Sequence, residues 1–285
     1  MYYTKEYMRT LFPLIRMKEE AYRALENHFD ELAPEEAEAV ARFWADTTVK
    51  RSEKVASINK IAEKEHGDLL CVLIYMAASG YTHEEYRKNG IPDEVFYNTF
   101  NCLAEKMETN MKFKGVWGYP SETWPALHTG MEIFRIGRLS YELQTANADV
   151  TSEDRVLIEK GQKYLYMHIS DNEKLCGCEE SIRNAREFFA EFYPEYAHGV
   201  IYTRTWLLEP RLSELLPEDS NIMRFQKLFN IFGRMDNMPE VAVRVFGEYK
   251  EKPDEYIPTT SLAKEIVNYF KKGGVLGSGM GITKL

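Results

Sequence analysis

Apolar residues recur at helical spacing through the first 112 residues of the chain. Residues 33–46 predict a helix that begins near Pro34, with acidic residues in the turn that faces the positive end of the helix dipole. Residues 52–65 place their aliphatic side chains on one stripe, which predicts an amphipathic helix. The first part of the chain is therefore expected to be helical.

Residues 69–76 are apolar on every side, which predicts a buried central helix that ends at Gly80. Thr82 is expected to cap a short helix that stops at Gly90. Pro92 then opens a long helix, because proline suits the first position of a helix.

The pattern changes near Gly115, where turn residues precede strand-like runs. The expected strands are 133–143, 164–169, 200–207 and 241–246. Helices are expected over 179–192, from Arg211 and over 261–272, and Pro239 is expected to interrupt a hairpin. We predict an α+β protein with a helical N-terminal domain over residues 1–125 and a mixed-sheet domain over residues 126–285.

Charge and composition exclude several classes of function. The chain has 285 residues, of which 44% are hydrophobic, and its net charge is −9. This charge disfavours binding to nucleic acid or to an anionic membrane, since both need clustered cations. The chain has four cysteines, its first residues lack the apolar core of a signal peptide, and it has no long apolar run. These features predict a reduced, cytoplasmic protein. The expected partner is a small-molecule substrate, and the oligomeric state is left open.

Several sequence segments resemble a family of bacterial acyltransferase-domain proteins. They are GIPDEVFYNTF (90–100), IFRIGRLSYE (133–142), YMHIS (166–170), TWLLEP (205–210), SNIMRFQ (220–226), TSLAKEIVNY (260–269) and the ending GGVLGSGMG. Members have a helical N-acyltransferase N-terminal domain and a GNAT-like (N-acetyltransferase-like) C-terminal domain. The resemblance implies transfer of an acyl group from acetyl-CoA or another acyl-CoA to an amine or hydroxyl, without a metal.

The resemblance also implies where the acyl-CoA would bind. Two adjacent parallel strands would separate to admit its pantetheine arm, and the helix that follows the first of them would point its N-terminus at the pyrophosphate. In the loop at 170–178, Lys174 and Gly177 suit a phosphate. Glu179 and Glu180 come directly after this loop, and their negative charges repel an anionic ligand.

His168 is the first candidate for a catalytic base. Strand alternation places it on one face with Tyr164 and Tyr166, and an imidazole can take a proton near neutral pH. The alternative is a histidine at the end of a strand that is hydrogen-bonded to the backbone. Tyr202 is the candidate for the general acid, and a threonine of the same strand is the alternative. The resemblance implies this role for a tyrosine.

Arg138 and Glu142 are expected on one face of the strand at 133–143, four residues apart. Arg138 would orient an acidic group of the substrate, and Glu142 would polarise a water or an amine. The alternative, favoured for Glu142, is a structural ion pair. Trp206 and Asn221 complete the candidate substrate site, with core packing for Trp206 and a helix cap at Ser220 as the alternatives.

Cys176 and Cys178 resemble half of a metal site, but two thiolates do not make the four ligands that zinc prefers. A cysteine nucleophile and a plain surface loop are the other interpretations, and the loop is favoured. The glycine-rich tail at 273–281 follows a helix, so we expect its glycines to end that helix and let the tail fold over a neighbouring segment.

Two functional hypotheses remain open. The first is a GNAT-like acyltransferase in which His168 is the base. The second is a GNAT-like scaffold without acyl-CoA that binds a small molecule or a protein partner, which the acidic loop before Glu179 favours.

Overall fold

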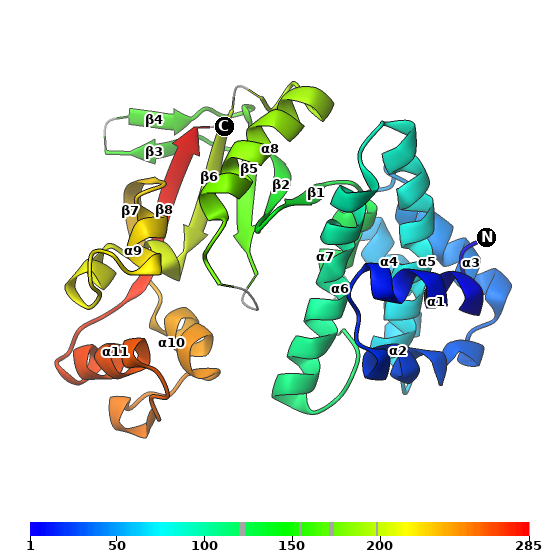
Figure 1. Ribbon diagram of the computed structural model, residues 1–285, viewed down its shortest axis with the longest axis horizontal. Helices are drawn as coiled ribbons and strands as arrows, with labels where there is room; N and C mark the ends of the chain where they lie inside the picture. The colour runs from blue at the N-terminus through cyan, green and yellow to red at the C-terminus, as the bar shows by residue number, and fades with distance from the viewer. Residues whose placement is uncertain (120–122, 154, 171–173, 198, 285) are drawn as a thin grey trace. The chain divides into compact units, whose positions relative to one another are not determined.

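The computed structural model describes residues 1–119, 123–153, 155–170, 174–197 and 199–284 (Figure 1). The chain forms two compact units, Met1–Ile136 and Gly137–Leu285. Helices make up nearly all of the first unit, and the second unit combines strands with helices. The predicted α+β class is therefore confirmed. No helix among these residues is long and apolar enough to span a bilayer.

The first unit is built around one buried helix. Its elements are α1 (Lys5–Leu14), α2 (Glu19–Glu26), the 3-10 helix η1 (Phe29–Glu31), α3 (Pro34–Ala45), α4 (Arg51–Ala62), α5 (Gly67–Lys88), α6 (Asp93–Lys114), α7 (Thr123–Thr129) and β1 (Ile133–Ile136). Residues 70–80 of α5 are all buried, as the apolar run predicted. Pro34 lies in the first turn of α3, and Pro92 is the N-cap of α6.

The helix α5 continues through the two positions where the sequence predicted a break. A Cβ on Gly80 would lie 2.2 Å from the ring of Tyr2, so this glycine permits close packing and does not end the helix. The Thr82 hydroxyl donates to the carbonyls of Ala78 and Thr129, each at 3.2 Å, so it does not cap a new helix. The predicted stop at Gly80 and the predicted cap at Thr82 are wrong, because tertiary contacts hold both residues inside one helix.

The second unit contains a mixed sheet flanked by helices. Its elements are β2 (Leu139–Thr145), β3 (Val150–Ser152), β4 (Arg155–Ile158), β5 (Lys163–Ile169), α8 (Cys178–Phe192), β6 (Val200–Thr205), η2 (Trp206–Leu208), η3 (Pro210–Glu214), α9 (Asn221–Gln226), β7 (Asn230–Asp236), α10 (Met238–Phe246), η4 (Pro253–Glu255), α11 (Ser261–Lys271) and β8 (Gly277–Lys284). The strands of its main sheet follow the order β2-β5-β6-β8-β7.

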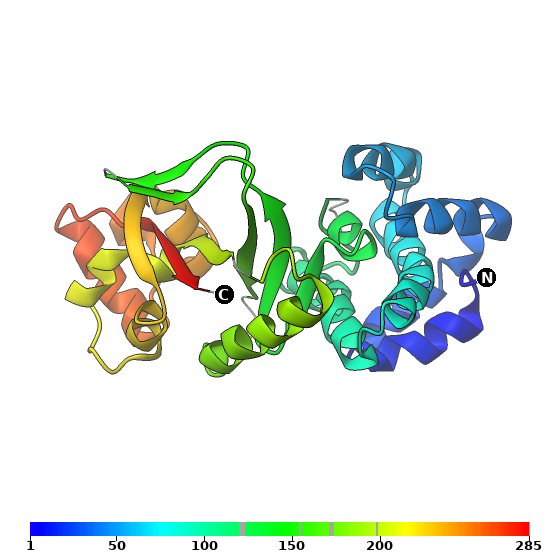
Figure 2. The ribbon, with the colours of Figure 1, turned by 90° about the horizontal axis from the view of Figure 1, so that it is seen from above.

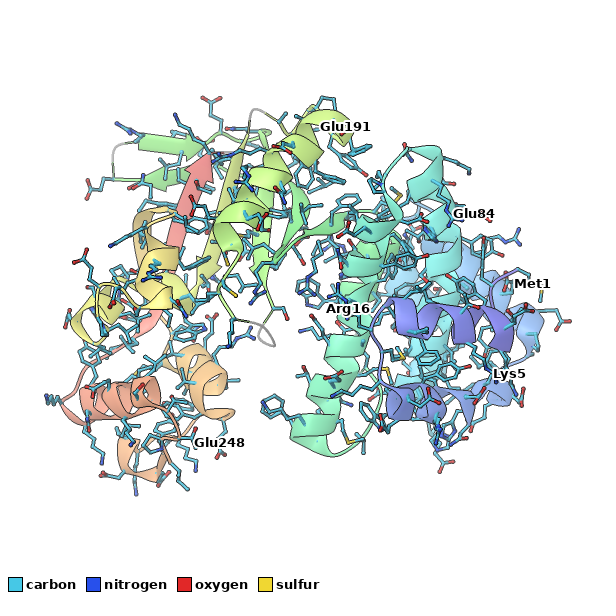
Figure 3. All side chains as sticks on the ribbon, in the orientation of Figure 1. Met1, Lys5, Arg16, Glu84, Glu191 and Glu248 are labelled. Carbon is cyan, nitrogen blue, oxygen red and sulfur yellow. The ribbon has the colours of Figure 1, made fainter. Side chains whose placement is uncertain are left out.

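One pair in this sheet is parallel. The strands β5 and β6 are joined through α8 and pair at Leu165 with Ile201 and at Tyr166 with Tyr202, while the other pairs are antiparallel. The helix α8 lies over the sheet, and its C-terminal end carries Glu191 (Figures 1 and 3). Figure 2 shows β3 and β4 as a two-stranded ribbon that extends from the end of β2 toward β7.

Residues 133–143 do not form one strand. Gly137 and Arg138 make the turn that separates β1 from β2, and Gly137 has a φ of 64°, which glycine adopts at little cost. Arg138 therefore does not lie on the strand face of Glu142, and the prediction that placed both there is wrong.

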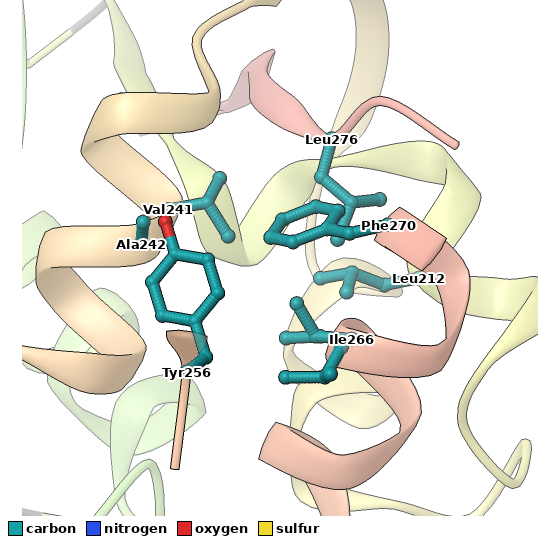
Figure 4. Packing of buried hydrophobic residues seen from close by; sticks show 8 residues of the cluster. Leu212, Val241, Ala242, Tyr256, Ile266, Phe270 and Leu276 are labelled. Atoms are coloured by element: carbon teal, nitrogen blue, oxygen red, sulfur yellow. The ribbon is translucent and has the colours of Figure 1, made fainter. Parts of the chain in front are cut away.

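Residues 241–246 form the end of helix α10, not a strand. Pro239 lies in the first turn of α10, where its missing N–H costs nothing. Val241, Ala242 and Val245 point into one apolar cluster, which is helical spacing. The residues of this cluster are Leu212, Val241, Ala242, Tyr256, Ile266, Val267, Phe270 and Leu276 (Figure 4). Burial against α11 therefore overrides the strand propensity of the valines.

The glycine-rich tail ends the chain as strand β8, between β6 and β7. Gly273 follows α11 with a φ of 82°, so the predicted helix end is confirmed. From Gly277 on, the tail pairs within the sheet and does not fold over a neighbouring segment. A Cβ on Gly279 would lie 1.8 Å from the carbonyl oxygen of Leu208, so η2 can pass over β8 only because this residue is glycine.

Candidate active site

The two faces of the sheet carry different side chains. On one face, Leu165 and Met167 of β5 are buried, and the Tyr141 hydroxyl contacts the Ser181 hydroxyl of α8 at 3.0 Å. Strand alternation turns Tyr164, Tyr166 and His168 to the opposite face, where all three are half-buried. This second face offers polar side chains to a ligand.

His168 contacts Glu142 on the neighbouring strand. The imidazole Nε2 and the carboxylate Oε2 are 2.9 Å apart, and the pair comes from β5 and β2, which are antiparallel. The side chain of Glu142 is only 8% exposed and that of His168 is 22% exposed. The Gln144 amide donates to the other carboxylate oxygen at 2.5 Å. Both oxygens of a buried carboxylate are thus held, and one of them orients an imidazole that solvent can reach.

Two tyrosines lie next to this pair. The Tyr166 ring centroid is 4.8 Å from that of His168 and 5.5 Å from that of Tyr202, which is directly across the parallel pair. Burial raises the pKa of both phenols, so both hydroxyls stay protonated at neutral pH. We name His168, Glu142, Gln144, Tyr166 and Tyr202 the His168 cluster.

The His168 cluster combines the groups needed for proton transfer in both directions. An imidazole can take a proton from a reacting group, and a carboxylate in contact with its Nε2 stabilises the resulting imidazolium. A protonated phenol beside it can donate a proton to a leaving group.

Arg138 holds the segment that precedes α8. Its Nε donates to the carbonyl of Lys174 and its Nη2 to the carbonyl of Ser170, each at 2.7 Å, and the residue is 8% exposed. This geometry gives Arg138 a positioning role toward the expected phosphate loop. Its proposed contact with an acidic group of the substrate has no support in these contacts.

The expected phosphate site lies at the N-terminus of α8. Gly177 is the N-cap, with a φ of 82°, and Lys174 is exposed. Within the described part of the chain, no side-chain hydrogen bond caps this helix, and the first N–H groups of a helix attract anions. Glu179 and Glu180 are both exposed in the first turn. Residues 171–173 of the same loop lie outside the described residues.

The two cysteines beside this helix differ in their surroundings. Cys176 is exposed and Cys178 is buried. Burial raises the pKa of the Cys178 thiol to about 11, so it remains protonated at neutral pH. A nucleophilic role for Cys178 is therefore not supported.

Trp206 and Asn221 lie apart from these groups. Trp206 begins η2, beyond the end of β6, and packs against the apolar cluster of α10 and α11. Asn221 is an exposed first residue of α9, and the preceding Ser220 accepts a hydrogen bond from the N–H of Met223 as the expected cap. No described contact joins either residue to the His168 cluster.

Gln144 and Tyr166 were not identified as site residues from the sequence. Alternation alone places Tyr166 on the face of His168, and it places Gln144 on the face of Glu142. The register between β2 and β5 brings the two sets together, and no local pattern in the sequence specifies that register.

Comparison with known proteins agrees with this architecture. The model of the GNAT-like C-terminal domain matches residues 133–283, and the model of the N-acyltransferase N-terminal domain matches residues 6–131. No curated protein matches the sequence.

Solved structures of acyltransferases have a similar fold. An acyltransferase in complex with decanoyl-CoA and teicoplanin shares 22% identity with this chain, over 98% of it and 88% of the other, at a TM-score of 0.74. An acyltransferase in complex with CoA and 10C-teicoplanin shares 21% identity, over 100% and 90%, at a TM-score of 0.76.

Proposed function

Because the chain belongs to the family of the GNAT-like C-terminal domain, as its sequence resemblance predicted, we propose that it transfers an acyl group from acyl-CoA to an amine or hydroxyl acceptor. The chain has the GNAT-like acyltransferase fold. The observation that carries the proposal is the contact between His168 and the buried Glu142, at 2.9 Å on the half-buried face of the sheet.

The residues near α8 suit the phosphates of acyl-CoA in part. The first N–H groups of α8 and the exposed Lys174 attract an anion, and Arg138 holds the backbone of the loop in place. Glu179 and Glu180 weaken that attraction. We therefore infer a donor site of reduced affinity at this end of the sheet.

The proposed steps are proton transfers by side chains of the His168 cluster. As the acceptor amine or hydroxyl attacks the thioester carbonyl, His168 takes its proton, and Glu142 stabilises the charged imidazole. The carbon–sulfur bond breaks, and Tyr202 donates its proton to the departing sulfur. The proton on His168 then returns to Tyr202 through solvent, which restores both groups.

The second candidate function is a scaffold that binds a ligand without acyl transfer. The two carboxylates in the first turn of α8 favour it, because they oppose the phosphates of the donor. Under this hypothesis the His168 cluster would bind a polar group of a ligand and move no proton.

Calorimetric titration with CoA and with decanoyl-CoA at low salt separates the two candidates. We expect saturable binding at micromolar to submillimolar concentrations, with decanoyl-CoA tighter than CoA because its chain adds apolar surface. If millimolar CoA and decanoyl-CoA gave no heat and no shift in melting temperature, the donor proposal would be contradicted. The scaffold hypothesis would then remain.

Release of free CoA thiol from decanoyl-CoA then tests turnover against a panel of amines and hydroxyl compounds. Teicoplanin is the first acceptor to try, since a solved structure of similar fold contains it. The control is the same assay without acceptor. Donor binding without thiol release on any acceptor would limit the conclusion to a CoA-binding protein.

A further inference from the structure

Two histidines and a glutamate meet on the surface of the first unit, far from the His168 cluster in the sequence. His28 Nδ1 lies 2.7 Å from Glu31 Oε1, and His66 Nδ1 lies 3.0 Å from the same oxygen and 3.1 Å from Oε2. The three donor atoms lie within 4.8 Å of one another. We propose that these three residues bind a divalent transition-metal ion, Zn²⁺ in the first place.

The spacing of the donor atoms is close to that of a coordination sphere. Zinc binds imidazole nitrogen and carboxylate oxygen at about 2.0–2.2 Å, which places neighbouring tetrahedral ligands about 3.3 Å apart. The separations from the imidazole nitrogens to the Glu31 carboxylate are 2.7–3.1 Å, so an ion fits after shifts of a few tenths of an ångström. The nitrogens of the two imidazoles lie within 4.8 Å of each other, so binding would have to bring them to about 3.3 Å.

The backbone around the three ligands is held by the core. Phe29, between His28 and Glu31, is buried and stacks on Tyr3 at 4.5 Å. His66 is the N-cap of α5, and its carbonyl accepts from the N–H of Leu69 and Leu70. The ligands therefore project from two fixed elements, η1 and the start of α5, and metal binding would order few additional residues.

The chemistry of the ligand set selects the ion. Two imidazoles and one carboxylate suit zinc and its neighbours in the first transition row, and one or more water molecules complete the sphere. Magnesium and calcium prefer oxygen ligands and fit this set poorly.

Solvent can reach the three side chains. Glu31 is 41% exposed, and His28 and His66 are 23% and 36% exposed. The neighbouring Asp30 pairs with Lys5 at 2.8 Å, which offsets its charge beside the site. An ion can thus enter from solution without a change in the fold.

Titration of the untagged full-length protein with ZnCl₂, against a chromophoric competing chelator, tests this inference. We expect one ion per chain and a melting temperature that rises with zinc. Glu31→Gln and His66→Gln should each weaken zinc binding at least tenfold. Glu31 is exposed, and among the described residues no side-chain cap at α5 depends on His66, so both variants should fold; circular dichroism checks this.

The matched control is His168→Gln, which removes another histidine that lies 2.9 Å from a carboxylate. Its zinc affinity should equal that of the wild type. Equal affinity in Glu31→Gln, a loss in His168→Gln, or no stoichiometric binding would each overturn the proposal. Titration with Co²⁺ adds a spectroscopic check, because a thiolate charge-transfer band would assign the ion to Cys176 and contradict it.

Discussion

His168 and Glu142 contact each other through one hydrogen bond, and the position of the proton decides what the pair can do. In the tautomer with the proton on Nε2, the imidazole donates to the carboxylate, and Nδ1 is the nitrogen that would take a proton. Gln144 supplies a second hydrogen bond to the carboxylate, which supports the ionised form in a buried position.

Substitution of either residue should lower the rate of acyl transfer and leave donor binding intact. We expect His168→Ala to reduce kcat roughly 10²- to 10⁴-fold, the usual contribution of a general base. Glu142→Gln should lower kcat less, because the imidazole remains but loses its charged partner. Thiol release gives kcat, and calorimetry gives the donor Kd.

Tyr164→Phe is the matched control for these variants, because Tyr164 lies on the same face of β5. Its kcat should be close to that of the wild type. If His168→Ala retained full turnover, His168 would not be the base. If both variants lost donor binding together with kcat, their role would be structural.

Lys54 is a buried cation in the first unit. It is 1% exposed, and among the described residues its Nζ has no hydrogen-bond partner. Burial lowers its pKa to about 8, against an opposing attraction from Glu132 and Asp46. Glu132 also pairs with Arg51 at 2.7 Å, so it does not depend on Lys54 for a partner.

Lys54→Met should therefore stabilise the protein at pH 7, by roughly 1–3 kcal/mol in the free energy of unfolding. Between about pH 8 and the unfolded value of 10.5, the unfolded wild type binds more protons than the folded form. Wild-type stability then rises with pH, and the advantage of the variant shrinks. Urea unfolding at pH 7 and pH 9.5 measures both effects; an advantage that grew with pH would contradict this account.

At the scale of elements, α8 combines an anion-attracting N-terminus with two carboxylates that oppose it. Glu179→Gln with Glu180→Gln should strengthen CoA binding roughly three- to tenfold, since each charge near a helix end contributes up to about 1 kcal/mol. Calorimetric Kd values test this. Glu191→Gln, at the other end of α8, is the control and should change little (Figure 3). No gain in the double variant would place the donor phosphates away from α8.

Elements with a clear period or a clear terminal residue were predicted from the sequence, as α3, α6 and β5 show. Elements whose form depends on a distant partner were not. The valines of α10 favour a strand locally, but packing against α11 makes them helical. The strand β8 has three glycines among its eight residues, which no strand propensity favours, and its pairing with β6 and β7 decides its form.

At the scale of the whole molecule, the net charge of −9 repels an anionic acyl-CoA donor as it approaches. The association rate constant for decanoyl-CoA should therefore rise with ionic strength, from about 0.02 M to about 0.3 M salt, as the repulsion is screened. Stopped-flow fluorescence measures it, and decanoyl-pantetheine, which has no phosphates, should show little dependence. A rate constant that fell with salt would indicate a locally cationic entrance.

The sequence by itself determined the α+β class, the helical character of the N-terminal part of the chain, and the family. These depend on the period of hydrophobic residues, on helix ends, and on family-like segments that occur in order along the chain. It also named His168, Glu142 and Tyr202 as candidates. Only the tertiary structure decided that Glu142 faces His168 while Arg138 faces the loop before α8, and that His28 and His66 share Glu31. Apart from the local contact of His28 with Glu31, these contacts join residues 26 to 36 positions apart. The strand register and helix packing that create them are cooperative properties of the folded chain.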